Sequence, residues 1–212
     1  MTWEPAPPEL SLAGDEVHVW RAELERADLD AELDSDELAR AARFLSETAR
    51  RRFTAAHGVL RRILSRYTGT AAAALRFERT EFGKPYLAGT PVHFNLAHSG
   101  ALALYAVARA EVGVDLEQVR PALDVMGIAR RFLPEPECLE LRVLEGEEQR
   151  QAFFRLWTRR EAYLKARGIG IRGLGEPIAP GFFLADLAPA PGYLGAVAWA
   201  GTGGGRVCAW QL

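Results

Sequence analysis

The spacing of hydrophobic residues in the first third of the chain predicts one strand followed by two helices. Residues 16–24 alternate apolar and polar side chains imperfectly, as expected of a half-buried strand. Asp34 is followed three residues later by Glu37, which is the form of a capping box that opens a helix. Residues 46–67 keep their large apolar side chains on one side of a longer helix, and Gly69 is its expected end.

The middle of the chain changes to short strand-like runs. Between residues 75 and 119, β-prone segments are separated by turn sequences such as FGKP and AGTP, which predicts a meander of strands. In the last run, GVDLEQV, Val114 and Leu116 alternate with Asp115 and Glu117. Because successive side chains of a strand point to opposite faces, the two carboxylates are expected to share one surface.

Helical spacing returns in the second half and then gives way to strands. Residues 124–132 predict a helix that breaks at Pro134 and Pro136, and a longer helix is expected over about residues 147–167. Near the end of the chain, YLGAVAWA and RVCAWQL flank a GTGGG loop that would close a hairpin. A strand, helices and further strands thus occur twice. This order predicts the α+β class and a duplicated unit, with halves at residues 1–110 and 111–212.

Composition narrows the class of protein. With 49% hydrophobic residues, 25% charged residues and a formal net charge of −2, the chain is neither disordered nor collagen-like. Its longest uncharged apolar run, residues 101–108, is far too short to cross a bilayer, and the first residues have no signal pattern. We therefore expect a cytoplasmic protein with no membrane partner. Cys138 and Cys208 are the only cysteines, which excludes a disulfide framework and a thiolate metal cluster and leaves oxygen ligands for a metal.

Two groups of residues suggest a metal site. Asp115 and Glu117, two apart on one strand face, could both bind a hard cation such as Mg²⁺; the alternative is a solvated polar face. Trp157, Glu161 and Lys165 are spaced four apart and lie along one stripe of the long helix. There, Glu161 would add a third carboxylate, and the alternative is an exposed Glu–Lys pair with the tryptophan in the core.

Dispersed cations suggest a polyphosphate ligand. Of the 26 lysines and arginines only Lys84 and Lys165 are lysines, and Lys84 lies in the Gly-Lys-Pro turn. His98 and Ser99 end a predicted strand, but neighbouring strand residues point oppositely, so we discount a Ser–His hydrolase. We instead expect Lys84, His98 and Lys165 to bind phosphates. His57, on the apolar side of its helix, is expected to be a satisfied core histidine.

The helix near residues 50–66 is rich in arginine, which raises the possibility of nucleic-acid binding. Against this, the whole chain is slightly acidic, the arginines fall around several faces, and no recognition module is evident. A solvated face is the simpler interpretation, and no nucleic-acid partner is expected. The arginines concerned are Arg50, Arg51, Arg52, Arg61, Arg62 and Arg66.

Taken in order, FGKP, FNLAHSG, GVDLE and WTRREAYLKARGIG resemble the motifs of the Sfp-type 4′-phosphopantetheinyl transferases. Each string is weak alone, but the ordered set is specific. The resemblance implies two similar α/β-type halves in a pseudo-twofold arrangement, with the active site in the cleft between them. It also implies a monomer that uses Mg²⁺ to transfer phosphopantetheine from coenzyme A to a serine of an acyl or peptidyl carrier protein, releasing adenosine 3′,5′-bisphosphate.

The resemblance also implies roles for individual residues. Glu161 matches a glutamate that completes the metal site or acts as the base. We choose Glu161 as the base that removes the proton from the carrier serine. The implied metal ligands are Asp115, Glu117 and Glu161. The implied coenzyme A contacts are Arg52, Lys84, His98 and Lys165, and the implied catalytic residues are Glu161 and Lys165.

Two residues depart from the family pattern. Ala97 stands where a serine is usual, and Arg160 stands where a lysine is usual. Both put the affinity for coenzyme A in question more than the type of reaction. One alternative is therefore a non-catalytic module that binds coenzyme A or a carrier protein; a salt-sensitive nucleic-acid-binding protein is the other. Residues 132–144, which include Leu139, are a candidate flap for docking the carrier.

Overall fold

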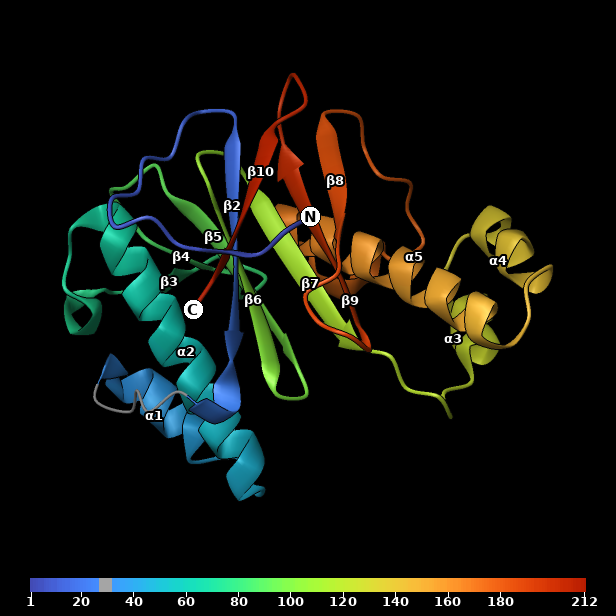
Figure 1. Ribbon diagram of the computed structural model, residues 1–212, viewed down its shortest axis with the longest axis horizontal. Helices are drawn as coiled ribbons and strands as arrows, with labels where there is room; N and C mark the ends of the chain where they lie inside the picture. The colour runs from blue at the N-terminus through green and yellow to red at the C-terminus, as the bar shows by residue number, and fades with distance from the viewer. Residues whose placement is uncertain (27–31) are drawn as a thin grey trace.

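The computed structural model describes residues 1–26 and 32–212, and its fold is α+β as expected. Two sheets lie face to face, and one long helix covers the outer face of each (Figure 1). The larger sheet has the strand order β1-β10-β2-β6-β5, and the smaller one has the order β7-β9-β8. No helix among the described residues is long and apolar enough to cross a membrane. The strands are β1 (Glu4–Pro5), β2 (Glu16–Glu23), β3 (Glu78–Arg79), β4 (Pro85–Tyr86), β5 (His93–Ser99), β6 (Leu102–Ala108), β7 (Val112–Gln118), β8 (Phe182–Leu187), β9 (Tyr193–Ala200) and β10 (Arg206–Gln211).

The helices begin and end where local sequence signals place them. The Asp34–Glu37 capping box is present at the start of the first helix, and Ser46 caps the second, which Gly69 ends in the left-handed conformation. The helix at residues 135–142 was not expected, because Pro134 and Pro136 predict a break in helical structure. Proline is tolerated in the first turn of a helix, where its missing N–H has no partner to lose. The helices are α1 (Ser35–Ala41), α2 (Glu47–Thr68), α3 (Val125–Phe132), α4 (Glu135–Arg142) and α5 (Gly146–Arg167).

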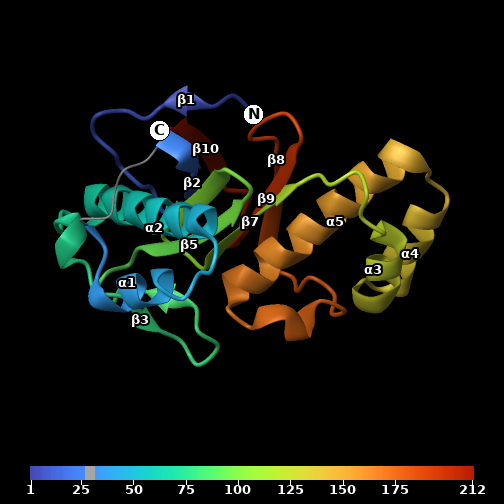
Figure 2. The same cartoon turned by 90° about the horizontal axis from the view of Figure 1, so that it is seen from below.

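The layers run from α2 through the two sheets to α5 (Figure 2). On the α2 side, the apolar face of the helix covers Trp20 and Tyr105 of the larger sheet. Between the sheets, Val17 and Val19 of β2 share a buried cluster with Val114 of β7. The core between the two sheets therefore holds β5 and β7 close together. The candidate site lies near the ends of these two strands.

The predicted hairpin at the end of the chain is wrong. β9 pairs with β7 and β8, whereas β10 crosses to the other sheet and pairs with β2 in parallel. The glycine-rich loop makes this crossing, and at Gly205 an added Cβ would lie 2.7 Å from the carbonyl oxygen of Asp15. The expected meander is likewise divided, because β3 and β4 form their own small sheet and β7 leaves the sheet of β5 and β6.

Candidate active site

Three carboxylates and a lysine meet where β7 lies against α5. The alternation predicted from the sequence holds, because Val114 and Leu116 enter the core between the sheets. Asp115 and Glu117 face the other way, as does Gly113. An added Cβ at Gly113 would lie only 2.1 Å from the carbonyl oxygen of Ala162 in α5. Glycine therefore allows the helix backbone to touch the strand.

The close approach of α5 brings Glu161 and Lys165 to the acidic strand. Lys165 Nζ lies 2.5 Å from Asp115 Oδ1. The Asp115 side chain is 7% exposed, and its second oxygen, Oδ2, is buried without a hydrogen-bond partner among the described residues. Burial raises the pKa of both Glu117 and Glu161, and the negative charge of Asp115 raises each further. The cluster thus carries more negative charge than its one lysine compensates.

This arrangement fits a divalent cation. A bound cation would compensate the orphaned, buried carboxylate oxygen of Asp115 and the two carboxyls whose pKa lies above the ordinary value. The donors are all oxygens, the type that Mg²⁺ prefers. Asp115, Glu117 and Glu161 are therefore suited to hold it.

Ser99 connects the two halves of the chain at this site. Its hydroxyl donates to Glu117 Oε2 at 3.3 Å and accepts from the backbone N–H of Gln118 at 3.1 Å. Ser99 was not expected to be a nucleophile, and its sequence context predicted no other role for it. Its position at the end of β5, next to the end of β7, makes it a support for the Glu117 carboxylate.

His98 lies on the opposite face of β5 from Ser99, among other cationic groups. Its side chain is exposed, yet desolvation by its surroundings lowers its pKa, and the positive fields of His57, Lys165 and Arg52 lower it further. His57 is half-buried rather than fully in the core, but it has a partner as expected, with Nδ1 2.9 Å from Glu37 Oε1. Arg52 already pairs with a carboxylate, because its Nη2 donates to Glu25 Oε1 at 2.6 Å. Anions that enter this region would meet several positive groups.

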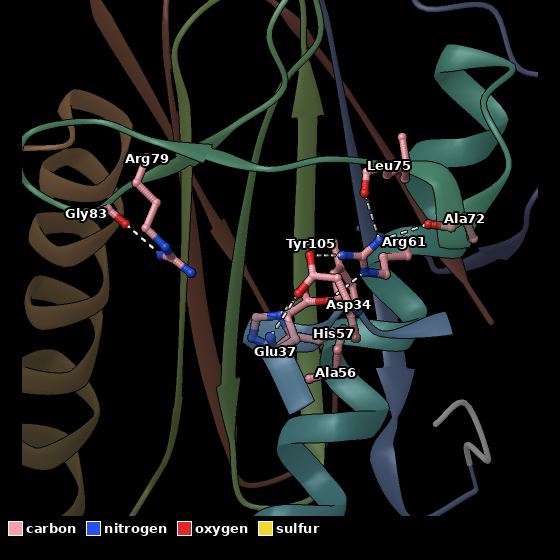
Figure 3. Close-up of polar contacts among 10 residues, drawn as sticks. All are labelled: Asp34, Glu37, Ala56, His57, Arg61, Ala72, Leu75, Arg79, Gly83 and Tyr105. Carbon is pink, nitrogen blue, oxygen red and sulfur yellow. Dashed lines mark hydrogen bonds and ion pairs between the residues drawn. The ribbon is translucent and has the colours of Figure 1, made fainter. Parts of the chain in front are cut away.

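A buried arginine holds the helices around a cavity beside these groups (Figure 3). Arg61 is fully buried and donates to Glu37 Oε2 at 2.6 Å and to Asp34 Oδ2 at 2.5 Å. Two backbone carbonyls, of Ala72 and Leu75, accept from its Nη1. The cavity measures about 250 Å³ and is lined by Asp34, Glu37, His57, Phe77, Gly83 and Asn95, among others.

Most arginines of α2 are engaged within the protein. Arg50 contacts Glu47, Arg62 donates to both carboxylate oxygens of Glu32, and Arg66 donates to the Pro7 carbonyl. A larger groove of about 840 Å³ lies beside this helix, against Trp20 and Leu212. It contains none of the predicted site residues.

Lys84 does not point into the acidic cluster. Its Nζ donates to the carbonyl oxygens of Val112 at 3.0 Å and of Ala166 at 2.6 Å. Burial lowers the pKa of Lys84 to about 8, although Glu111 opposes the shift. The ammonium thereby joins the β3–β4 turn of the first half to the last turn of α5, whose carbonyls lack helical partners.

Comparison with known proteins finds one relative that matches nearly the full length of the chain. Residues 111–199 match the 4′-phosphopantetheinyl transferase superfamily model, and residues 1–110 match the model of a 4′-phosphopantetheinyl transferase N-terminal region. The chain is 44% identical to the 4′-phosphopantetheinyl transferase HetI of Nostoc sp. over 225 residues, 95% of each chain. The chain belongs to the 4′-phosphopantetheinyl transferase superfamily. This confirms the family and the enzyme class that its motifs resembled.

Other relatives match over a shorter part of the chain. The Sfp transferase of Bacillus subtilis (strain 168) is 32% identical over 114 residues, 53% of this chain and 50% of its own. The AcpT transferase of Salmonella typhi is 43% identical over 90 residues, 42% of this chain and 47% of its own.

The two departures from the transferase motifs lie outside the acidic cluster. The Ala97 methyl is buried in the apolar core between the sheets, on the opposite face of β5 from His98. Arg160 is 6% exposed; it binds both oxygens of Glu137 in α4 at 2.6 and 2.7 Å and donates to the carbonyls of Leu174 and Glu176. An arginine fork suits these four acceptors better than a lysine would. Neither residue contacts Asp115, Glu117 or Glu161 in these interactions.

Sequence reasoning missed three residues that build this candidate site: Gly113, Ser99 and Asn95. The amide oxygen of Asn95 accepts from the backbone N–H of Val114 at 2.9 Å and so ties β5 to β7. All three act between β7 and another element, which no local pattern reveals. One signal for Gly113 was available in the sequence. A glycine stands shortly before the acidic pair, at a strand position where a larger side chain would be expected.

We predict that Glu117→Gln raises the melting temperature at pH 7 when no divalent ion is present. Because burial and Asp115 raise the pKa of Glu117, its ionised form destabilises the folded state, and a neutral amide removes that cost. The gain should shrink as the pH falls towards the ordinary value of 4.5, where the native carboxyl becomes protonated. Thermal unfolding between pH 4 and 8 measures this, with exposed Glu140→Gln on α4 as the control. A lower melting temperature at pH 7 would contradict it.

Proposed function

We propose that this chain transfers the 4′-phosphopantetheine group of coenzyme A to a serine hydroxyl of an apo acyl or peptidyl carrier protein, with Mg²⁺ as cofactor. The observation that carries the proposal is the cluster of Asp115, Glu117 and Glu161 beside Lys165, in a chain that belongs to the transferase superfamily. The cluster offers both metal-binding carboxylates and a cation for phosphate oxygens.

The reaction exchanges the phosphoanhydride bond of coenzyme A for a phosphodiester bond to the carrier serine. The carrier serine oxygen bonds to the phosphorus that bears pantetheine, the bond from that phosphorus to the bridging oxygen breaks, and adenosine 3′,5′-bisphosphate leaves with the electron pair. The serine proton passes to a base. Charge develops on phosphoryl oxygens, so rate enhancement depends on positioning and electrostatic stabilisation.

Glu161 is suited to accept the serine proton. Burial raises its pKa, and the nearby charge of Asp115 adds to that shift, whereas Lys165 opposes it. A carboxylate with a raised pKa is a stronger base than one in water. Its place on α5, one turn before Lys165, holds it beside the charge that the phosphate would meet.

Mg²⁺ bound by Asp115, Glu117 and Glu161 would supply positive charge for the pyrophosphate oxygens. The protein residues do the rest. Asp115 orients the Lys165 ammonium through the 2.5 Å ion pair, and Ser99 orients the Glu117 carboxylate. The Lys165 ammonium can then move its hydrogen bond from the Asp115 carboxylate to a phosphate oxygen of the substrate.

The surrounding cations support binding of the remaining phosphates. His98, with Arg52 and His57 nearby, offers positive charge on the α2 side of β5. The cavity of about 250 Å³ next to them is bounded by Gly83 and Pro85 of the FGKP turn, and we assign the nucleoside end of coenzyme A to it. Lys84 supports this region through the carbonyls that it bridges.

We assign the carrier to the surface formed by residues 132–144. Here α4 exposes Leu139 and Val143, with 49% and 82% of their areas accessible, beside the N-terminal half of α5. Because both halves of the site lie on one chain, we propose that it acts as a monomer, in the cytoplasm, where coenzyme A is supplied.

Intact-mass measurement of several apo-carrier proteins tests the proposal. Incubation with this chain, coenzyme A and Mg²⁺ should add one phosphopantetheinyl group to at least one carrier and release an equal amount of adenosine 3′,5′-bisphosphate. EDTA should prevent both. Coenzyme A binding without any mass change would favour the non-catalytic module instead, and no coenzyme A binding would refute the proposal.

A further inference from the structure

A second group of metal-ligand side chains lies far from the acidic cluster, on the α2 side of the larger sheet. β2 and β10 run in parallel there, with Arg206 opposite Glu16 and Cys208 opposite His18 (Figure 1). One ligand atom from each of Glu16, His18 and Cys208 lies within 4.8 Å of the others. Neither the family motifs nor the proposed transfer reaction uses these three residues.

The spacing is close to that of a tetrahedral metal site. Glu16 Oε2 and His18 Nε2 are 3.5 Å apart. Bonds of about 2.0–2.3 Å from Zn²⁺ to oxygen, nitrogen and sulfur place neighbouring tetrahedral ligands about 3.5 Å apart. Only the half-buried thiol of Cys208 must move closer to the other two ligand atoms. Its sulfur already lies within 4.8 Å of both, so the movement needed is small.

We propose that Glu16, His18 and Cys208 form a binding site for a thiophilic divalent cation, Zn²⁺ above all, with water as the fourth ligand. Carboxylate, imidazole and thiolate are all common zinc ligands, and three protein ligands plus water is a known type of site. The presence of only two cysteines in the sequence excludes a thiolate cluster, but it does not exclude a site that combines one thiolate with a carboxylate and an imidazole.

Neighbouring groups orient the ligands for this role. Tyr67 Oη lies 2.7 Å from His18 Nδ1, and Trp20 Nε1 donates to the same hydroxyl at 2.9 Å. The imidazole is thereby fixed by its Nδ1, while Nε2 faces Glu16. The backbone N–H of Ala13 donates to Glu16 Oε2 at 3.1 Å. Such outer contacts are typical of protein metal sites.

The protonation of the ligands also suits metal binding. Burial lowers the pKa of His18, so the neutral, ligating imidazole dominates at neutral pH. Burial raises the pKa of Cys208, so the thiol is protonated until a metal displaces its proton.

The positive charge of Arg206 opposes metal binding at this site. It pairs with Glu16 Oε1, but 73% of its side chain is exposed, so it can move away without leaving a buried charge. Its removal should tighten metal binding. Substitution of Arg206 should therefore increase the affinity for the metal, whereas substitution of a ligand should reduce it.

Cobalt titration tests the proposal, because Co²⁺ takes the place of Zn²⁺ and its bond to a thiolate gives an intense near-ultraviolet absorption. The metal-stripped full chain should show this absorption in excess Mg²⁺, which occupies oxygen sites, and equimolar Zn²⁺ should abolish it. Cys208→Ser should lose the absorption and weaken Co²⁺ binding at least about tenfold. Cys138→Ser, the matched control at a buried cysteine in α4, should keep both. Arg206→Gln should bind Co²⁺ more tightly.

A second measurement needs no variant and so does not depend on folding of Cys208→Ser. Zn²⁺ should slow alkylation of Cys208 in the wild-type chain and raise the melting temperature, because it joins β2 to β10 only in the folded state. Absence of the cobalt–thiolate absorption in the wild type would overturn the proposal. So would absorption that persists in Cys208→Ser, or alkylation of Cys208 that Zn²⁺ does not slow.

Discussion

Asp115→Asn is expected to reduce kcat/KM for carrier modification by about 10²–10³-fold, the loss typical of removing one preorganised electrostatic group. The amide keeps the shape of the side chain but removes the charge that pairs with Lys165 and that would bind Mg²⁺. Because the substitution also removes repulsion within the cluster, the folded protein should remain at least as stable. Steady-state kinetics with an apo-carrier, together with thermal unfolding, measure the two effects separately.

Asp186→Asn is the matched control for this prediction. Asp186 lies on β8, is 40% exposed and forms both hydrogen bonds of an ion pair with Arg159 on α5. An exposed pair of this kind contributes little, so kcat/KM should stay within about twofold of the wild type. A similar modest loss for both variants would mean that the acidic strand is not the reaction centre.

Gly113→Val is expected to cause the largest loss of stability, at least about 3 kcal/mol, because the added atoms overlap main-chain atoms that cannot rotate away. An ideal Cβ at this position would lie 2.1 Å from the Ala162 carbonyl oxygen and 2.2 Å from the Ala166 nitrogen. The helix α5 must move off β7 and carry Glu161 and Lys165 with it. Chemical denaturation should show the loss of stability, and activity should be undetectable in whatever protein folds.

Gly14→Val provides the control, since nothing lies within 4 Å of a Cβ at Gly14. Its free energy of unfolding should change by less than about 1 kcal/mol, as for most surface positions. If Gly113→Val were as stable and active as the control, the contact between α5 and β7 would not be what assembles the site.

The elements that local sequence predicts well are those whose signals are themselves local. The capping residues Asp34, Glu37 and Ser46 and the terminal Gly69 act within one turn of a helix, so their positions were readable. Which sheet a strand joins depends on contacts between distant residues. β10 could be predicted as a strand, but its parallel pairing with β2, across about 190 residues, could not.

The same distinction applies to the site. Strand alternation put Asp115 and Glu117 on one face, and helical spacing aligned Glu161 with Lys165, before any contact between them was known. The resemblance to a known family supplied the link between the two elements. Lys84 illustrates the limit, because its turn was identified but its two carbonyl partners come from β7 and α5.

The measurement that tests the central claim most directly is an intact-mass time course of one modifiable apo-carrier with wild type, Glu161→Gln and Glu140→Gln. The wild type and Glu140→Gln, which changes an exposed residue of α4, should add one phosphopantetheinyl group at the same rate. Glu161→Gln should be folded, as judged by its melting temperature, and should add none on that time scale. Modification by Glu161→Gln at the wild-type rate would show that the chemistry lies elsewhere than in the carboxylate cluster between β7 and α5.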